Sequence, residues 1–171
     1  MFYGAINETQ LLACAIEVVR CVDAIEERVF NAVLVRCPAV RLLLETAAQE
    51  THLGHFRDPT PHSAGAGLCQ VDPIGLEDIR LRTNGTLKLR IRDRFGIDIN
   101  TLTASHLEYS PLASMLAARL HYRLRPGTIP VGLDGRAQYW KIFYNTRAGK
   151  GRADDYIDNA KQYVAPLVGG Y

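Results

Sequence analysis

The 171-residue sequence predicts a mainly α-helical protein, with at most one small β-hairpin near residues 79–92. Apolar residues recur at intervals of three and four along residues 8–21, which is helical spacing. Signals that start helices, such as a capping side chain followed by proline or acidic residues, precede several other apolar stretches. Alternating apolar and polar residues around Asn84-Gly85 are typical of a hairpin with a type I′ turn.

Two helices are expected in the N-terminal segment, residues 1–37. The first covers 8–21. Asp23 and Glu26 have the spacing of a capping box, so we expect a second helix from there to about Arg36.

Five further helices are expected along the chain. The first of them runs from about Pro38 to His52, with Gly54 as a candidate C-cap, and another begins near Pro73. Ser110-Pro111 is typical of an N-cap followed by a proline at the first helical position, and this helix should end near residue 124. The last two are expected at 135–146 and 153–165. The prolines and glycines of residues 55–66 predict a loop.

Residues 79–95 allow two interpretations. The alternation described above favours a hairpin, whereas Leu87, Ile91 and Phe95 also fit one face of a helix. Six of these 17 residues are Lys or Arg. A solvated basic face is the simpler explanation, and a groove for a polyanion is the alternative.

Composition and charge are those of an ordinary globular protein, with 47% apolar and 22% charged residues. A formal net charge of +2 does not predict nucleic-acid binding. The N-terminal segment lacks the pattern of a signal peptide, and charges interrupt every apolar stretch. We therefore expect a protein made in the cytosol, without a membrane partner, that leaves the cell only by lysis or in a particle.

Cysteines and histidines raise the question of a metal site. The cysteines are Cys14, Cys21, Cys37 and Cys69. Cys14 and Cys21 would lie about 10 Å apart on one helix, too far for a disulfide, so we expect reduced, buried thiols. His52, His55 and His62 could assemble a site, but no HExxH pair is present. We expect these imidazoles to be exposed or hydrogen-bonded, and no metal or cofactor.

Glu50 is the residue best placed for chemistry. It lies in the last turn of the helix expected over 38–52, where the helix dipole disfavours its ionised form. Partial burial would also raise its pKa, and a carboxyl that is neutral near pH 7 can protonate a leaving oxygen. Glu45 lies about 140° around the same helix, so the two carboxyls cannot face one cleft.

The segment "QETHLG…SAGAGLCQVDP" resembles the catalytic region of lytic transglycosylases and goose-type lysozymes, which belong to the lysozyme-like superfamily. In that family the catalytic glutamate ends a helix, and a Gly-Leu-Met-Gln turn follows after a loop. The matching residues are Glu50-Thr51 and the turn Gly67-Leu68-Cys69-Gln70, in which a cysteine replaces the methionine.

A second segment, "FYNTRAGKG", resembles the Ala-Tyr-Asn-x-Gly-x-Gly block of the same family, with Tyr144 and Asn145 as the matching pair. Phe143 replaces the small residue, and three residues instead of one separate Asn145 from Gly149. The remainder is similar to small phage proteins. The resemblance implies one lysozyme-like domain over 1–171, with a catalytic-like core over 38–165.

The resemblance implies cleavage of the β-1,4 bond between N-acetylmuramic acid and N-acetylglucosamine in peptidoglycan glycan strands. Glu50 would act as the catalytic acid. Thr51, Gly67, Gln70, Tyr144 and Asn145 would bind or position the substrate. A lytic transglycosylase needs one carboxyl, whereas a hydrolase would use a second, for which Asp58, Asp72 and Asp78 are candidates. Trp140 is interpreted as a core residue.

Two other functions stay open from the sequence. The chain could be a structural protein of a phage virion, in the tail or inside the capsid, with a lysozyme-like fold and little activity, packed against other virion proteins. It could also bind a polyanion through the basic side chains of 79–95, although the small net charge speaks against nucleic acid. The candidate side chains are Arg80, Arg82, Lys88, Arg90, Arg92 and Arg94.

Overall fold

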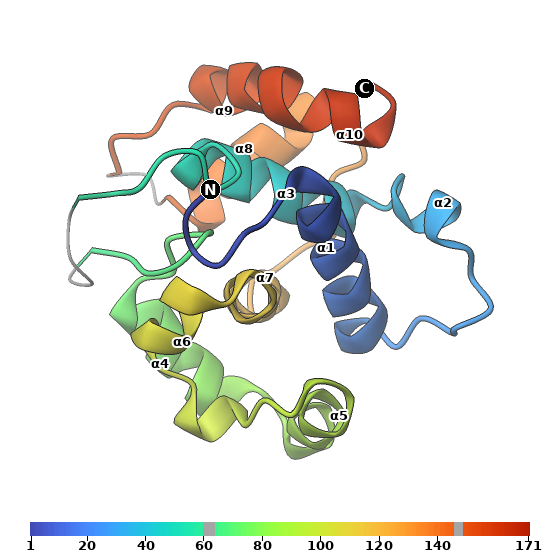
Figure 1. Ribbon diagram of the computed structural model, residues 1–171, viewed down its shortest axis with the longest axis vertical. Coiled ribbons are helices and arrows are strands. Elements are labelled where there is room, and N and C mark those ends of the chain that lie inside the picture. The colour runs from blue at the N-terminus through green and yellow to red at the C-terminus, as the bar shows by residue number, and fades with distance from the viewer. Residues whose placement is uncertain (60–63, 146–148) are drawn as a thin grey trace.

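The computed structural model describes residues 1–59, 64–145 and 149–171, and over these residues the fold is mainly α-helical, as the sequence predicts (Figure 1). The α-helices of the first half are α1 (Glu8–Val22), α2 (Asn31–Leu34), α3 (Pro38–Thr51), α4 (Pro73–Arg82) and α5 (Gly85–Phe95). A 3-10 turn, η1 (Ile99–Thr101), precedes α6 (Ala104–Tyr109), α7 (Pro111–Arg123) and α8 (Leu133–Phe143). The C-terminal segment consists of α9 (Ala153–Asn159), the π-helical η2 (Ala160–Val164) and α10 (Ala165–Val168).

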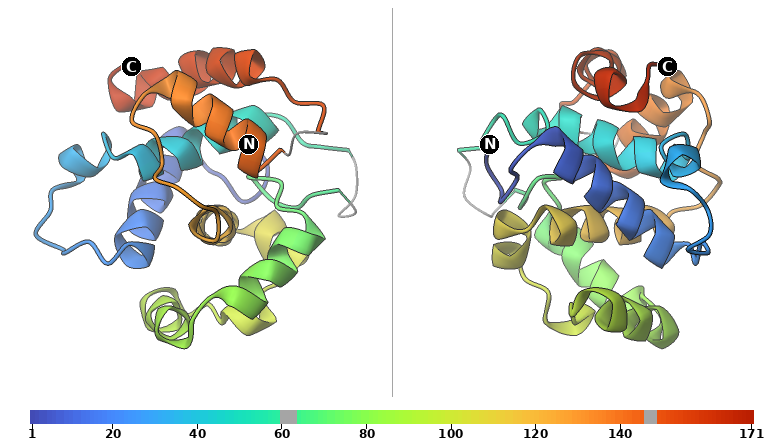
Figure 2. Two further views of the ribbon diagram at one scale, coloured as in Figure 1. Left: turned by 180° about the vertical axis from the view of Figure 1, so that it is seen from behind. Right: turned by 45° about the vertical axis from the view of Figure 1, so that its right-hand side comes forward.

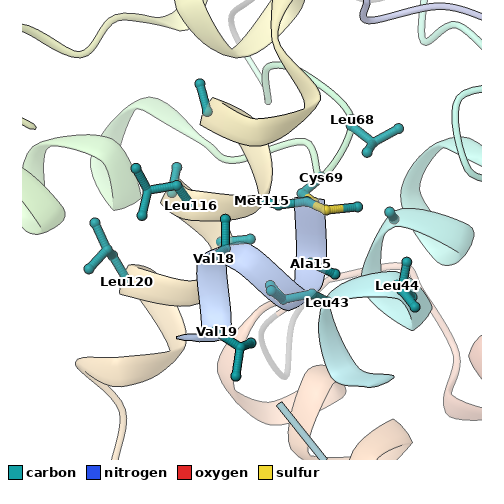
Figure 3. Close-up of a cluster of buried hydrophobic side chains, with 14 of the residues drawn as sticks. Ala15, Val18, Val19, Leu43, Leu44, Leu68, Cys69, Met115, Leu116 and Leu120 are labelled. Atoms are coloured by element: carbon teal, nitrogen blue, oxygen red, sulfur yellow. The ribbon is translucent and has the colours of Figure 1, made fainter. Parts of the chain in front are cut away.

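Helix α7 is the centre of the fold. Every residue from Ala113 to Tyr122 is buried, and a helix that is buried on all sides must be surrounded by other elements. Helices α1, α3, α4 and α6 pack against it. The main core is formed by side chains of α1, α3, α7 and the turn at 66–71 (Figure 3). Those labelled are Ala15, Val18, Val19, Leu43, Leu44, Leu68, Cys69, Met115, Leu116 and Leu120.

The other helices lie on two sides of this centre. Helices α8, α9 and α10 lie beyond α3, and α4 and α5 lie at the opposite end of the molecule (Figures 1 and 2). A second, smaller core between α3, α7, α8 and α9 contains several aromatic side chains. Its buried members are Leu42, Tyr122, Ala137, Tyr139, Trp140 and Tyr156. This aromatic core is important because it lies behind the candidate site.

The helix predicted from Asp23 to Arg36 is wrong, since only α2 forms there. The Arg20 guanidinium donates hydrogen bonds to the carbonyls of Glu26 (2.7 Å) and Val29 (2.9 Å), which holds this connection in an irregular path. The Asp23 carboxylate accepts from Arg119 of α7 instead of capping a new helix. Tertiary hydrogen bonds therefore override the local capping pattern.

The hairpin interpretation of 79–92 is also wrong, and the helical alternative is confirmed. Asn84 ends the connection between α4 and α5, and its side chain accepts a hydrogen bond from Leu87 N at 2.9 Å, as an N-cap does. Leu87 and Ile91 are buried one helical turn apart. The Asn-Gly pair thus starts a helix and makes no turn between strands.

The remaining differences lie at the ends of helices. Helix α3 ends at Thr51, one residue earlier than predicted. His52, and not Gly54, is its C-cap residue, in the left-handed conformation (φ 49°). The sequence did not predict η1 or α6.

All four cysteines are free, as expected, but only Cys21 and Cys69 are buried. Among the described residues, no helix has the length and apolar character needed to span a membrane.

Candidate active site

Glu50 lies half-buried in the last turn of α3, facing the aromatic core. The indole Nε1 of Trp140 in α8 donates a hydrogen bond to Glu50 Oε1 at 3.1 Å. Burial raises the pKa of Glu50 to about 7, against the opposing effect of this hydrogen bond, and the charge of Asp58 also raises it. Near neutral pH the carboxyl is therefore divided between its acid and base forms, as a general acid requires.

Glu50 lines a cavity of about 340 Å³. Its walls come from the end of α3, the loop before α4, the end of α7 and the end of α8. The lining residues are Glu50, Asp58, Ala64, Gly65, Gln70, Val71, Asp72, His121, Tyr144 and Asn145. Three of the predicted substrate-binding residues, Gln70, Tyr144 and Asn145, thus share one cavity with the predicted acid.

The turn at 66–71 forms one wall of this cavity. Ala66 and Val71 form an isolated antiparallel bridge, and the backbone between them enters the left-handed region at Gly67 (φ 73°) and Gln70 (φ 49°). A Cβ atom on Gly67 would lie 2.5 Å from the carbonyl oxygen of Leu107. Glycine is required at this position for its conformation and for the close approach of α6.

Hydrogen bonds attach the turn to several neighbouring elements, including a bond from the Gly67 amide to Glu108 Oε1 of α6 at 2.7 Å. The Thr51 hydroxyl of α3 donates to the carbonyl of Leu68 at 2.7 Å. The Cys69 amide donates to Ser114 Oγ of α7 at 2.9 Å, and the Tyr144 hydroxyl donates to the Cys69 carbonyl at 2.7 Å. These contacts fix the position of the turn relative to Glu50.

Thr51 and Gly67, which the sequence predicted to bind substrate, are therefore placed differently from that prediction. Both residues are buried, and Thr51 has no exposed surface. Thr51 holds the turn through its hydroxyl, Gly67 is part of the turn, and neither residue lines the cavity. Gln70 does line the cavity, and its Nε2 donates to the Gly67 carbonyl at 2.8 Å, which orients its side chain.

Tyr144 and Asn145, at the start of the second predicted segment, also line the cavity. Lys141 Nζ donates to Asn145 Oδ1 (2.9 Å) and to the Gly149 carbonyl (2.6 Å), which ties the two ends of the Tyr144–Gly151 block together. A Cβ atom on Gly149 would collide with the Asn145 carbonyl, and one on Gly151 would lie 2.5 Å from Trp140 Cη2. The two glycines thus permit close approach to Asn145 and to the indole that binds Glu50.

Trp140 contacts the candidate acid, a contact that the sequence interpretation did not predict. It is buried, as expected of a core residue, and its ring lies 5.2 Å from that of Tyr156. It also lies four residues before Tyr144, which places both side chains on the same face of a helix. This spacing was the sequence signal that could have predicted the position of Trp140 near Tyr144.

His121 lines the cavity and was also not predicted from the sequence. Burial lowers its pKa, and its Nε2 lies 3.0 Å from the Phe143 carbonyl oxygen.

The candidate second carboxylates differ in position. Asp58 and Asp72 line the cavity with Glu50. Asp72 also caps α4 by accepting a hydrogen bond from Gly75 N. Asp78 does not line the cavity and pairs with Arg82 (3.1 Å) and Arg125 (3.6 Å). The geometry thus leaves Asp58 and Asp72 as the carboxylates beside Glu50.

Glu45 faces away from the cavity, as its angular position predicted. It is completely buried and accepts hydrogen bonds from Arg136 Nε at 2.7 Å and Nη2 at 2.8 Å. The Tyr156 hydroxyl donates to the same carboxylate at 3.0 Å. This buried pair connects α3, α8 and α9 and has a structural role.

His52 and His55, which follow α3, contact other side chains of the protein. His52 stacks on Tyr163 with ring centroids 5.0 Å apart, and His55 Nε2 lies 2.8 Å from Glu8 Oε1. His62 lies outside the described residues. Within the described part of the chain, no three His, Cys, Asp or Glu side chains are grouped to hold a metal ion.

The basic stretch at 79–95 is largely engaged in contacts within the protein. Arg80 binds Glu77, Arg82 binds Asp78, and Arg94 binds Glu17 at 2.5 Å. Lys88 Nζ donates to the Arg80 carbonyl at 2.6 Å. These pairs favour a structural role for the stretch over a free polyanion groove.

Comparison with known proteins finds no matching family model, no matching curated protein and no matching solved structure. The function is therefore inferred from the geometry of the residues around Glu50.

Proposed function

We propose that this protein cleaves the β-1,4 bond between N-acetylmuramic acid and N-acetylglucosamine in peptidoglycan, with Glu50 as the catalytic acid. The observation that carries the proposal is a half-buried carboxyl with a pKa of about 7, at the wall of a cavity. Such a group can donate a proton to a glycosidic oxygen at neutral pH. Residues from both sequence segments that resemble lytic transglycosylases, Glu50 and Gln70 from the first and Tyr144 and Asn145 from the second, line that cavity.

The first step would break the bond between the anomeric carbon and the glycosidic oxygen. Glu50 gives its proton to the departing oxygen while positive charge develops on the sugar ring. In the transglycosylase reaction the Glu50 carboxylate then takes the proton of the muramic acid C6 hydroxyl. That oxygen bonds to the anomeric carbon and gives a 1,6-anhydro product, so the reaction needs no water and no second carboxyl.

Residues on the cavity wall would hold the glycan. The amide of Gln70 is oriented by its bond to Gly67 and lies beside Glu50 in the cavity. The Tyr144 hydroxyl is committed to the Cys69 carbonyl, so it would position the wall, and Asn145 would contact sugar. A hydrolytic outcome would place a water next to Asp58 or Asp72.

Digestion of purified peptidoglycan sacculi tests this proposal. Mass analysis of the soluble fragments should show anhydro-muropeptides, whereas reducing ends would indicate a lysozyme. Glu50→Gln should lower the rate of release by more than about a thousandfold, the usual effect of removing an essential catalytic group. Glu27→Gln is the matched control, because Glu27 is exposed and pairs with Arg94 away from the cavity. If the wild-type protein releases no soluble fragments from sacculi, the enzymatic proposal is wrong.

The resemblance to small phage proteins supports a role in penetration of the cell wall or in lysis. Detection of the chain in purified phage particles would indicate a virion component, and its absence a free lysin. Presence in particles together with no release from sacculi would favour the structural alternative.

A further inference from the structure

A second groove, of about 800 Å³, adjoins the Glu50 cavity. It runs between α4, the end of α7 and the end of α8, and it shares Asp72, His121 and Tyr144 with the cavity. The described residues that line it are Asp72, Pro73, Ile74, Gly75, Glu77, Asp78, Leu81, His121, Arg125, Ile142, Phe143 and Tyr144. A single ligand can therefore extend from Glu50 into this groove.

The walls of the groove are more apolar than those of the Glu50 cavity. Ile74, Leu81 and Ile142 are 82%, 73% and 42% exposed, so the groove presents aliphatic side chains to solvent. None of its described lining residues is Asn, Gln, Ser or Thr, the neutral side chains that satisfy sugar hydroxyls. A ligand with methyl groups would bury apolar surface here at low cost in lost hydrogen bonds.

The charged groups in the groove are of both signs. Asp78 pairs with Arg125 at 3.6 Å across the groove wall, and Glu77 pairs with Arg80 at 2.7 Å. The side chains of Glu77, Asp78 and Arg125 all retain exposed surface, with fractions of 54%, 25% and 26%. Such pairs can exchange partners with the carboxylate and ammonium groups of a peptide.

We propose that this groove binds the peptide carried on the lactyl group of the muramic acid whose bond Glu50 breaks. The inference rests on the proposed function, because it takes the glycan to be the occupant of the Glu50 cavity. Aliphatic walls with a few charges fit short peptides rich in alanine that contain acidic and diamino residues. The protein would accordingly prefer glycan that bears peptides over glycan from which an amidase has removed them.

Binding measurements on the Glu50→Gln protein test the proposal, since this variant should hold substrate without turning it over. The probes are two soluble glycan fragments of equal sugar length, one with its peptides and one after amidase treatment. Calorimetry should show about tenfold tighter binding of the peptide-bearing fragment, the effect expected from burying a few aliphatic groups.

A groove variant and a control locate the preference. Ile74→Ser combined with Leu81→Ser removes two exposed side chains from the groove, so folding should be unaffected. It should reduce the preference to less than about twofold without changing affinity for the peptide-free fragment. Leu89→Ser combined with Val131→Ser changes two exposed apolar residues outside the groove and should keep the preference.

Each outcome bears on the inference separately from the catalytic proposal. Equal affinity for the two fragments would overturn the proposal that the groove binds peptide. An equal loss of affinity for both fragments in the groove variant would also overturn it, because that result would indicate a sugar site. A clear preference in a protein that releases nothing from sacculi would support the groove and refute the catalytic proposal.

Discussion

The hydrogen bond from Trp140 Nε1 to Glu50 Oε1, 3.1 Å long, joins two segments that are 90 residues apart in the chain. It connects the helix that carries the candidate acid with the helix that leads into the Tyr144–Gly151 block. The indole is buried, and it contacts the tilted ring of Tyr156 in α9 and the backbone at Gly151. Trp140 therefore orients the Glu50 carboxyl, and its hydrogen bond lowers the pKa of Glu50 against the larger raising effect of burial.

The rate of peptidoglycan cleavage should depend on pH through Glu50. Its protonated form is the proton donor, and its pKa is raised to about 7. Activity should therefore be maintained as the pH falls toward 6 and should decrease about tenfold for each pH unit well above 7. Initial rates of release from sacculi between pH 5 and 9 provide the measurement. A rate that rises steadily to pH 9 would contradict the assignment of Glu50 as the acid.

Trp140→Phe should move the alkaline limb of that profile to higher pH. The variant keeps an aromatic ring but removes the N–H that stabilises the Glu50 carboxylate, so the pKa of Glu50 should rise, by roughly one pH unit for a lost charge-assisted hydrogen bond. The pH–rate profile is compared with that of Tyr139→Phe, a change of the preceding aromatic residue in α8. If the alkaline limb moves to lower pH in Trp140→Phe, entry of water into the site would have a larger effect on the pKa of Glu50 than loss of the hydrogen bond.

Gly67→Ala should destabilise the protein more than Gly96→Ala. Both glycines have positive φ angles, 73° and 68°, so alanine is strained at both positions. A Cβ atom on Gly67 would also meet the Leu107 carbonyl oxygen at 2.5 Å, whereas one on Gly96 would meet nothing within 4 Å. We expect losses in free energy of unfolding of more than about 3 kcal/mol and about 1 kcal/mol respectively. Denaturant unfolding measures both, and equal losses would show that the turn can shift.

The buried pair of Glu45 and Arg136 should respond differently to single and double substitution. Glu45→Leu leaves a guanidinium buried without its carboxylate and should cost about 3–5 kcal/mol. Glu45→Leu combined with Arg136→Met removes both charges and should recover much of that loss. Unfolding by urea gives the coupling energy. A double variant as unstable as the sum of the two single variants would show that the two residues act independently.

The sequence alone predicted the features that depend on neighbouring residues. Helix α7 begins at Pro111 because Ser110 caps it locally, and α3 begins at Pro38 for a similar local reason, the proline at its first position. The position of Glu50 at the end of α3 was predicted in the same way. So was the opposite orientation of Glu45, because both follow from helix geometry.

Tertiary structure decided what depends on distant partners. Residues 23–36 carry a capping pattern but form no long helix, because Arg20 binds their carbonyls. Thr51 matches a site motif but is buried beneath the turn, where its hydroxyl donates a hydrogen bond to the Leu68 carbonyl. Trp140 looks like a core residue, and only the packing of α8 against α3 places its N–H on Glu50. Local spacing determines a side chain's place on its own helix, whereas its hydrogen-bond partner and pKa depend on which other helix packs against it.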